Sequence, residues 1–222
     1  MIPAREALER LREGNLRFAS DQRDTEVLIH QPRRTELAKG QEPFAIVLGC
    51  SDSRVPAEIV FDQGLGDLFV IRVAGNIVAP SQVGSVEFAA ARFGTRLVVV
   101  LGHSECGAIL ATIEELRRPT ENQSPNLRAI VDRVRPAVEP LLPGRRADET
   151  ALVRDAVRAN IRASVDGLRH GSAILEALVR EEGLLIVGAE YGLASGRVTF
   201  FDEAPSPAPA PDAEVGFPPE AR

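Results

Sequence analysis

The chain has 222 residues, of which 44% are apolar and 26% are charged, and its formal net charge is −6. These values suit one globular domain with a sizeable core, and they argue against a disordered chain, a nucleic-acid-binding surface and a polybasic membrane anchor. No apolar run approaches the roughly 20 residues that cross a bilayer, and residues 1–18 lack the apolar centre of a secretion signal. We therefore expect a cytoplasmic protein with neither nucleic-acid nor membrane partners.

An amphipathic helix is predicted at the start of the chain, over residues 3–18. Leu8, Leu11 and Phe18 recur there at helical spacing, which gathers them on one face. A polar stretch follows, up to about Pro43. The apolar face of this N-terminal helical arm needs a surface to cover, and we expect a partner subunit to provide it.

Four short, continuously apolar runs rich in β-branched residues predict strands that are buried on both faces. They are FAIVLGC at 44–50, DLFVIRVAG at 67–75, RLVVVLGH at 96–103 and GLLIVGAE at 183–190. Helical patterns alternate with them, over 82–93, over 105–117 and from 148 onward, and a loop is expected at 118–126. This alternation predicts an α/β domain with a largely parallel central β-sheet flanked by helices, together with the N-terminal helical arm.

The predicted domain ends at residue 203. The remaining stretch, residues 204–222, contains six prolines and almost no core-forming pattern. Such a composition is typical of an extended or disordered tail. The sequence therefore indicates one domain over residues 1–203 and a proline-rich tail over residues 204–222.

Two stretches of the chain echo each other, VLGCSDSR at 47–54 and VLGHSEC at 100–106. Aligning them superimposes Cys50 on His103, and each of these residues follows a glycine at the end of a predicted strand. Functional residues of parallel sheets collect at the carboxyl ends of strands, because the loops converge there. Cys106 lies three residues beyond His103, in the first turn of the next predicted helix, where the helix dipole favours a thiolate.

Cys50, His103 and Cys106 are together a ligand set that suits zinc. Two cysteines and one histidine with an open fourth position are a known catalytic arrangement. Taken singly, a cysteine at a strand end is more often a small core residue. Cys50 and Cys106 are, however, the only cysteines in the chain, and a cytosolic setting disfavours a disulfide between them. The conjunction favours a metal site.

Asp52 is a candidate for the fourth ligand. On the metal it would close the site and make it structural. Arg54, two residues further on, can instead hold the carboxylate in a bidentate contact and keep it ionised. That pairing would leave the fourth position free for water. A solvated surface pair of little consequence is the alternative reading of the two residues.

At this point the sequence resembles a known family, the β-class carbonic anhydrases of bacteria and plants. The resemblance rests on CSDSRV at 50–55 and GHSECGA at 102–108, with FVIRVAGN at 69–76 and GSVEFA at 84–89, and it covers most of residues 3–200. It implies one zinc ion per chain, held by Cys50, His103 and Cys106, beside a catalytic dyad of Asp52 and Arg54. The implied activity is reversible hydration of carbon dioxide to bicarbonate and a proton by zinc-bound hydroxide.

The resemblance also implies a narrow apolar substrate pocket. It assigns to this pocket Gln41, Phe69, Ala74, Phe88 and Gly107. Gln41 would hydrogen-bond substrate, and the backbone N–H of Gly107 would face it, whereas plain core packing is the alternative for each residue. Because the family's pocket lies at a subunit interface, we expect a homodimer or homotetramer in which Gln41 and the phenylalanines come from different chains.

Three other functions could use these residues. A hydrolase of carbonyl sulfide or carbon disulfide would show identical zinc ligands, and a non-catalytic zinc-stabilised interaction domain would keep Asp52 permanently on the metal. A thiol-redox protein is disfavoured, because the cysteines are not a close pair.

Val47 stands where bicarbonate-regulated relatives of the family carry tryptophan, and Gln41 is retained. We therefore expect an open resting site in which Asp52 is paired with Arg54.

Overall fold

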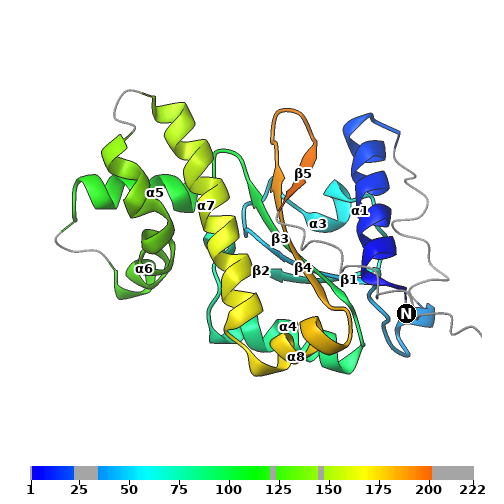
Figure 1. Ribbon diagram of the computed structural model, residues 1–222. Helices are drawn as coiled ribbons and strands as arrows, with labels where there is room; N and C mark the ends of the chain where they lie inside the picture. The colour runs from blue at the N-terminus through cyan, green and yellow to red at the C-terminus, as the bar shows by residue number, and fades with distance from the viewer. Residues whose placement is uncertain (1, 23–34, 121–123, 145–147, 202–222) are drawn as a thin grey trace, which may run out of the picture.

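The computed structural model describes residues 2–22, 35–120, 124–144 and 148–201 (Figure 1). The predicted tail at 204–222 and the centre of the predicted loop at 118–126 lie outside the described residues, so the boundary at residue 203 stays a prediction. None of the described helices is long and apolar enough to cross a membrane. The elements are α1 (Ala4–Ala19), β1 (Ala45–Gly49), α3 (Ala57–Val60), β2 (Leu68–Arg72), η1 (Ala74–Asn76), α4 (Pro80–Arg92), β3 (Leu97–His103), α5 (Gly107–Arg117), α6 (Pro125–Val138), η2 (Glu139–Gly144), α7 (Glu149–His170), α8 (Ala173–Glu181), β4 (Leu185–Tyr191) and β5 (Val198–Phe201).

The strands form one sheet in the order β2-β1-β3-β4-β5. The first four pair in parallel, and β5 runs antiparallel to β4. The four predicted strands and the largely parallel sheet are confirmed. The sequence analysis missed β5, a short edge strand that is never fully buried. The prediction that all four strands are buried on both faces is wrong for β2. This strand lies at the edge of the sheet opposite β5, and Phe69 and Val70 are only half-buried.

Alternate residues of the strands point into two hydrophobic cores, one on each face of the sheet. Val98 and Val100 of β3 pack on one face with Ile161 of α7. Val99 and Leu101 of the same strand point to the opposite face, toward α1 and α3. Figure 1 shows α7 and α1 on opposite sides of the sheet. Two helical layers therefore hold the strand ends in place.

The apolar face of α1 packs within its own chain. Leu8 is 2% exposed and Leu11 is fully buried, in one cluster with Phe61 and Leu101. Burying a leucine side chain stabilises a fold by about 1.5–3 kcal/mol, because its apolar surface leaves water. The expectation that a partner subunit must cover this face is therefore wrong, since α3 and β3 of the same chain cover it.

Candidate metal centre

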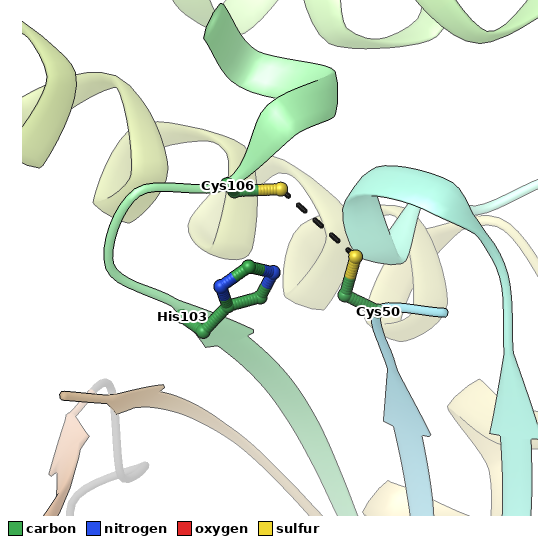
Figure 2. A group of neighbouring side chains, drawn as sticks. All are labelled: Cys50, His103 and Cys106. Carbon is green, nitrogen blue, oxygen red and sulfur yellow. Dashed lines mark hydrogen bonds between the residues drawn. The ribbon is translucent and has the colours of Figure 1, made fainter. Parts of the chain in front are cut away.

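The three predicted ligands converge at the carboxyl edge of the sheet. Cys50 directly follows β1, His103 is the last residue of the neighbouring strand β3, and Cys106 is the residue before α5. Their ligand atoms all lie within 4.8 Å of one another, and the two sulfur atoms are 4.0 Å apart (Figure 2). All three side chains are buried. The prediction that they form one group is confirmed by this geometry.

His103 presents one ring nitrogen to the two sulfur atoms. Its Nδ1 lies 2.8 Å from the carbonyl oxygen of Ser104. Because a carbonyl oxygen can only accept, Nδ1 carries the ring proton and donates a hydrogen bond to it. Nε2 is then an acceptor, and it is buried without a hydrogen-bond partner among the described residues. A buried, unpartnered nitrogen beside two thiols costs free energy unless a further group binds it. This donor set fits zinc.

The two cysteines share a proton when no metal is bound. A hydrogen bond with Cys106 lowers the pKa of Cys50 to about 4, although burial acts in the opposite direction. The same contact raises the pKa of Cys106, and burial adds to that rise. The pair therefore holds one proton between two sulfur atoms at neutral pH. Metal ligation needs both thiolates, so this proton leaves when a metal binds.

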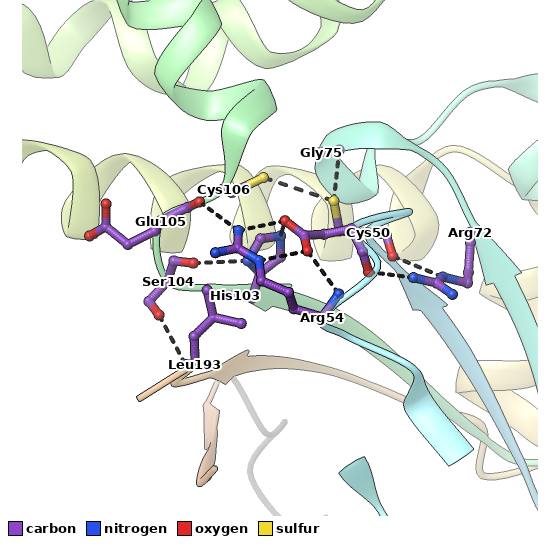
Figure 3. Close-up of polar contacts among 10 residues, drawn as sticks. Cys50, Arg54, Arg72, Gly75, His103, Ser104, Glu105, Cys106 and Leu193 are labelled. Atoms are coloured by element: carbon purple, nitrogen blue, oxygen red, sulfur yellow. Dashed lines mark hydrogen bonds and ion pairs between the residues drawn. The ribbon is translucent and has the colours of Figure 1, made fainter. Parts of the chain in front are cut away.

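Asp52 is held by Arg54, as predicted. Arg54 donates from Nε to Oδ1 of Asp52 at 2.9 Å, from Nη2 to Oδ2 at 2.7 Å and from its backbone N to Oδ1 at 3.0 Å (Figure 3). These hydrogen bonds hold the pKa of Asp52 well below its usual range, so the carboxylate is ionised. Its Oδ2 lies 3.8 Å from Nε2 of His103, outside the three-ligand group. Both oxygens of the Asp52 carboxylate are thus engaged by Arg54.

Arg72 supports the loop that carries Cys50 and Asp52, a role the sequence analysis missed. It donates from Nε to the Cys50 carbonyl at 3.0 Å and from Nη2 to the Asp52 carbonyl at 2.6 Å. The pairing of Gly49 with Arg72 in adjacent strands places it there. FVIRVAGN contains Arg72, but nothing in the spacing of that motif predicts contact with a loop 22 residues earlier.

Two of the predicted pocket residues lie beside the ligands. Ala74 begins the short helix η1, whose next residue, Gly75, donates its backbone N–H to Cys50 Sγ at 3.4 Å. Gly107 begins α5 directly after Cys106, and a Cβ added there would meet nothing within 4 Å. The position that a side chain would occupy at Gly107 therefore faces open space.

The other three predicted pocket residues lie at the opposite, amino edge of the sheet. Gln41 precedes β1 and lines a cavity of about 550 Å³ that also includes Phe44 and Phe93. Phe69 pairs with Ile46 in β1, four residues before Cys50 and thus about 13 Å along the strand. The Phe88 ring packs 6.2 Å from that of Phe69 and is 54% exposed. Within one chain, these residues do not meet the metal ligands.

Comparison with known proteins agrees with this geometry. The family described as carbonic anhydrase matches residues 45–198. Carbonic anhydrase 2 of Mycobacterium tuberculosis is 38% identical over 88% of this chain and 92% of its own length, and a carbonic anhydrase of Mycolicibacterium smegmatis is 39% identical over 86% and 90%. Among solved structures, the β-carbonic anhydrase CcaA superimposes with a TM-score of 0.70 at 26% identity, over 88% of this chain and 95% of that one. A tetrameric β-carbonic anhydrase of Sordaria macrospora superimposes with a TM-score of 0.67 at 27% identity, over 78% and 87%.

Proposed function

The chain belongs to the β-class carbonic anhydrase family, and from this premise we propose which of its residues bind zinc and which act on the substrate. It catalyses the zinc-dependent, reversible hydration of carbon dioxide to bicarbonate and a proton. Cys50, His103 and Cys106 are the zinc ligands. One observation carries this assignment, namely the convergence of two buried sulfur atoms on the unpartnered Nε2 of His103.

Asp52 and Arg54 are the catalytic pair. When bound, zinc acts as a Lewis acid that lowers the pKa of a water molecule, so that the water can lose a proton and attack carbon dioxide near neutral pH. Asp52 accepts a hydrogen bond from the attacking oxygen and so orients a lone pair toward the substrate carbon. Arg54 fixes the orientation of the Asp52 carboxylate through two side-chain hydrogen bonds. The Gly107 N–H and the methyl group of Ala74 line the substrate side of the site, and the released proton passes to solvent.

The remaining pocket residues come from a second copy of the chain. Gln41, Phe69 and Phe88 are separated from Cys50 in their own chain, and Phe88 is unusually exposed for its size. A symmetric dimer that brings the amino edge of one chain to the carboxyl edge of the other would complete both pockets at once. The tetrameric relative from Sordaria macrospora supports a homodimer or a tetramer of dimers. From the sequence, we also propose a single domain over residues 1–203 and a cytoplasmic location.

Stopped-flow hydration of carbon dioxide by the zinc-loaded protein tests the function, together with metal analysis of the same sample. We expect about one zinc per chain and hydration that the metal-free protein lacks. The same preparation is assayed with carbonyl sulfide and carbon disulfide. Hydrolysis of either without hydration of carbon dioxide would contradict the proposed function. A stoichiometric zinc content with no turnover of any of the three would indicate the non-catalytic zinc domain instead.

A further inference from the structure

The backbone N–H that contacts Cys50 belongs to a turn in the left-handed conformation. Gly75 has φ 71° and ψ 18°, and the next residue, Asn76, also has a positive φ of 43°. Glycine takes this conformation at little cost, and asparagine takes it more readily than most residues, so the backbone alone leaves other conformations open. The orientation of the Gly75 N–H, 3.4 Å from Cys50 Sγ, therefore depends on what holds this turn.

Helix α7 supplies two hydrogen bonds that hold the turn. Asn160 donates from Nδ2 to the Gly75 carbonyl at 2.8 Å, and Ser164 donates from Oγ to the Asn76 carbonyl at 3.0 Å. The two donors are four residues apart, so they lie on the same face of the helix. Asn160 is 2% exposed and Ser164 is 5% exposed. Two polar side chains at the buried face of a helix would be costly without these partners.

The turn lies close to its neighbouring elements. A Cβ added to Gly75 would lie 3.1 Å from Cβ of Ala108 in α5. A Cβ added to Gly102, beside the turn in β3, would lie 2.5 Å from Cδ1 of Ile161 in α7. The turn is thus enclosed between α5, β3 and α7. Its direction follows from where α7 places its two donors.

We propose that Asn160 and Ser164 are positioning residues that hold the Gly75 N–H on the sulfur of Cys50 and thereby slow the release of zinc. The inference rests on the proposed metal site. A hydrogen bond to a ligating thiolate fixes the direction of its lone pairs and withdraws charge from the sulfur. Without this hydrogen bond, the Cys50 side chain is freer to change rotamer, which would speed release. A more electron-rich sulfur would lower the energy of charge transfer to a bound Co²⁺ ion, which is a separate, spectroscopic effect.

Zinc release and a cobalt spectrum test the proposal in the full chain. The variants are Ser164→Ala and Asn160→Ala, with Ser164→Thr as the conservative replacement that keeps the hydroxyl. Thr95→Val is the matched control, because Thr95 is fully buried and donates from Oγ1 to the Pro43 carbonyl at 2.7 Å, at the amino edge of the sheet. Zinc transfer to an excess of the chromogenic chelator 4-(2-pyridylazo)resorcinol gives the release rate. The thiolate-to-metal charge-transfer band is recorded on the Co²⁺-loaded proteins.

We expect zinc release to be about tenfold faster in Ser164→Ala and Asn160→Ala, the low end of the effect of losing a hydrogen bond to a metal ligand, because both residues act through the Gly75 N–H. Their charge-transfer band should move to longer wavelength, whereas Ser164→Thr and Thr95→Val should match the parent in both measurements. An unchanged rate and band in Ser164→Ala would overturn the proposal, even if Asn160→Ala failed to fold. Equal acceleration in Thr95→Val would also overturn it. A parent chain that binds no zinc would refute the metal site itself, and the inference with it.

Discussion

The two edges of the sheet differ in how complete they are within one chain. At the carboxyl edge, Cys50, His103 and Cys106 are buried and already grouped, with Asp52 held beside them. At the amino edge, Gln41 lines an open cavity together with Phe44, Phe93 and charged residues such as Arg10 and Asp67. The proposed metal centre is thus grouped within a single chain, whereas the proposed substrate pocket also needs residues of a second copy. The four predictions below test this division, from the largest expected effect to the smallest.

Replacing Cys50 by serine should remove zinc and activity together. A serine hydroxyl is a poor zinc ligand compared with a thiolate, so the buried group loses one of its donors. Zinc per chain should fall to near zero, and hydration of carbon dioxide should fall to background. Metal analysis and stopped-flow assays measure both, with the exposed neighbour Ser51→Ala as the control. Full zinc occupancy with near-normal turnover would show that Cys50 is not a ligand.

Replacing Arg54 by alanine should lower kcat/KM by about a hundredfold, the usual cost of losing a group that orients the reacting atoms, while zinc stays bound. Asp52 would remain ionised near pH 7, because an unpaired aspartate titrates near a pKa of about 3.9. The loss would therefore report the orientation of Asp52 rather than its charge. Arg118→Ala, at an exposed position away from the site, is the matched control. Activity within twofold of the parent would contradict the catalytic role.

Mixing two inactive variants should restore activity if the amino edge of one chain serves the other. One chain carries Arg54→Ala and the other Gln41→Ala with Phe88→Ala. A mixed dimer would regain one intact site, so a randomly reassociated mixture should approach about a quarter of the parent activity. Stopped-flow assays after reassociation measure it, with each variant alone as the control. A mixture no more active than the average of its parts would place the pocket within one chain.

Activity should rise with pH as a single titration. Arg54 holds the pKa of Asp52 far below its usual range, so Asp52 keeps its charge and its partner as the pH falls through neutrality. No carboxylate is then released toward the metal, and added bicarbonate should act only as a product inhibitor. Initial rates between about pH 6.5 and 9 measure the profile. A steep, multi-proton profile would indicate that acid closes the site, and it would contradict the expected open resting site.

Local spacing and strand direction together were enough to predict which residues group at the candidate metal centre. His103 and Cys106 are three residues apart, and Asp52 and Arg54 are two apart, so a single turn or loop brings each pair together. Cys50 could be added because parallel strands end at the same edge of a sheet. Short-range geometry and strand direction are both visible in a sequence, and the structure agrees with both.

The sequence by itself determined the strands, the parallel sheet and the residues grouped around the candidate metal position, because chain spacing and apolar pattern control these directly. Only the tertiary structure decided how they are supported. Arg72 reaches the Cys50 loop through strand register, and Asn160 and Ser164 reach the Gly75 turn from a helix 85 and 88 residues further along. Register and helix packing also buried the face of α1 and placed Gln41 at the far edge. Such contacts depend on how elements stack in space, which no local pattern of residues specifies.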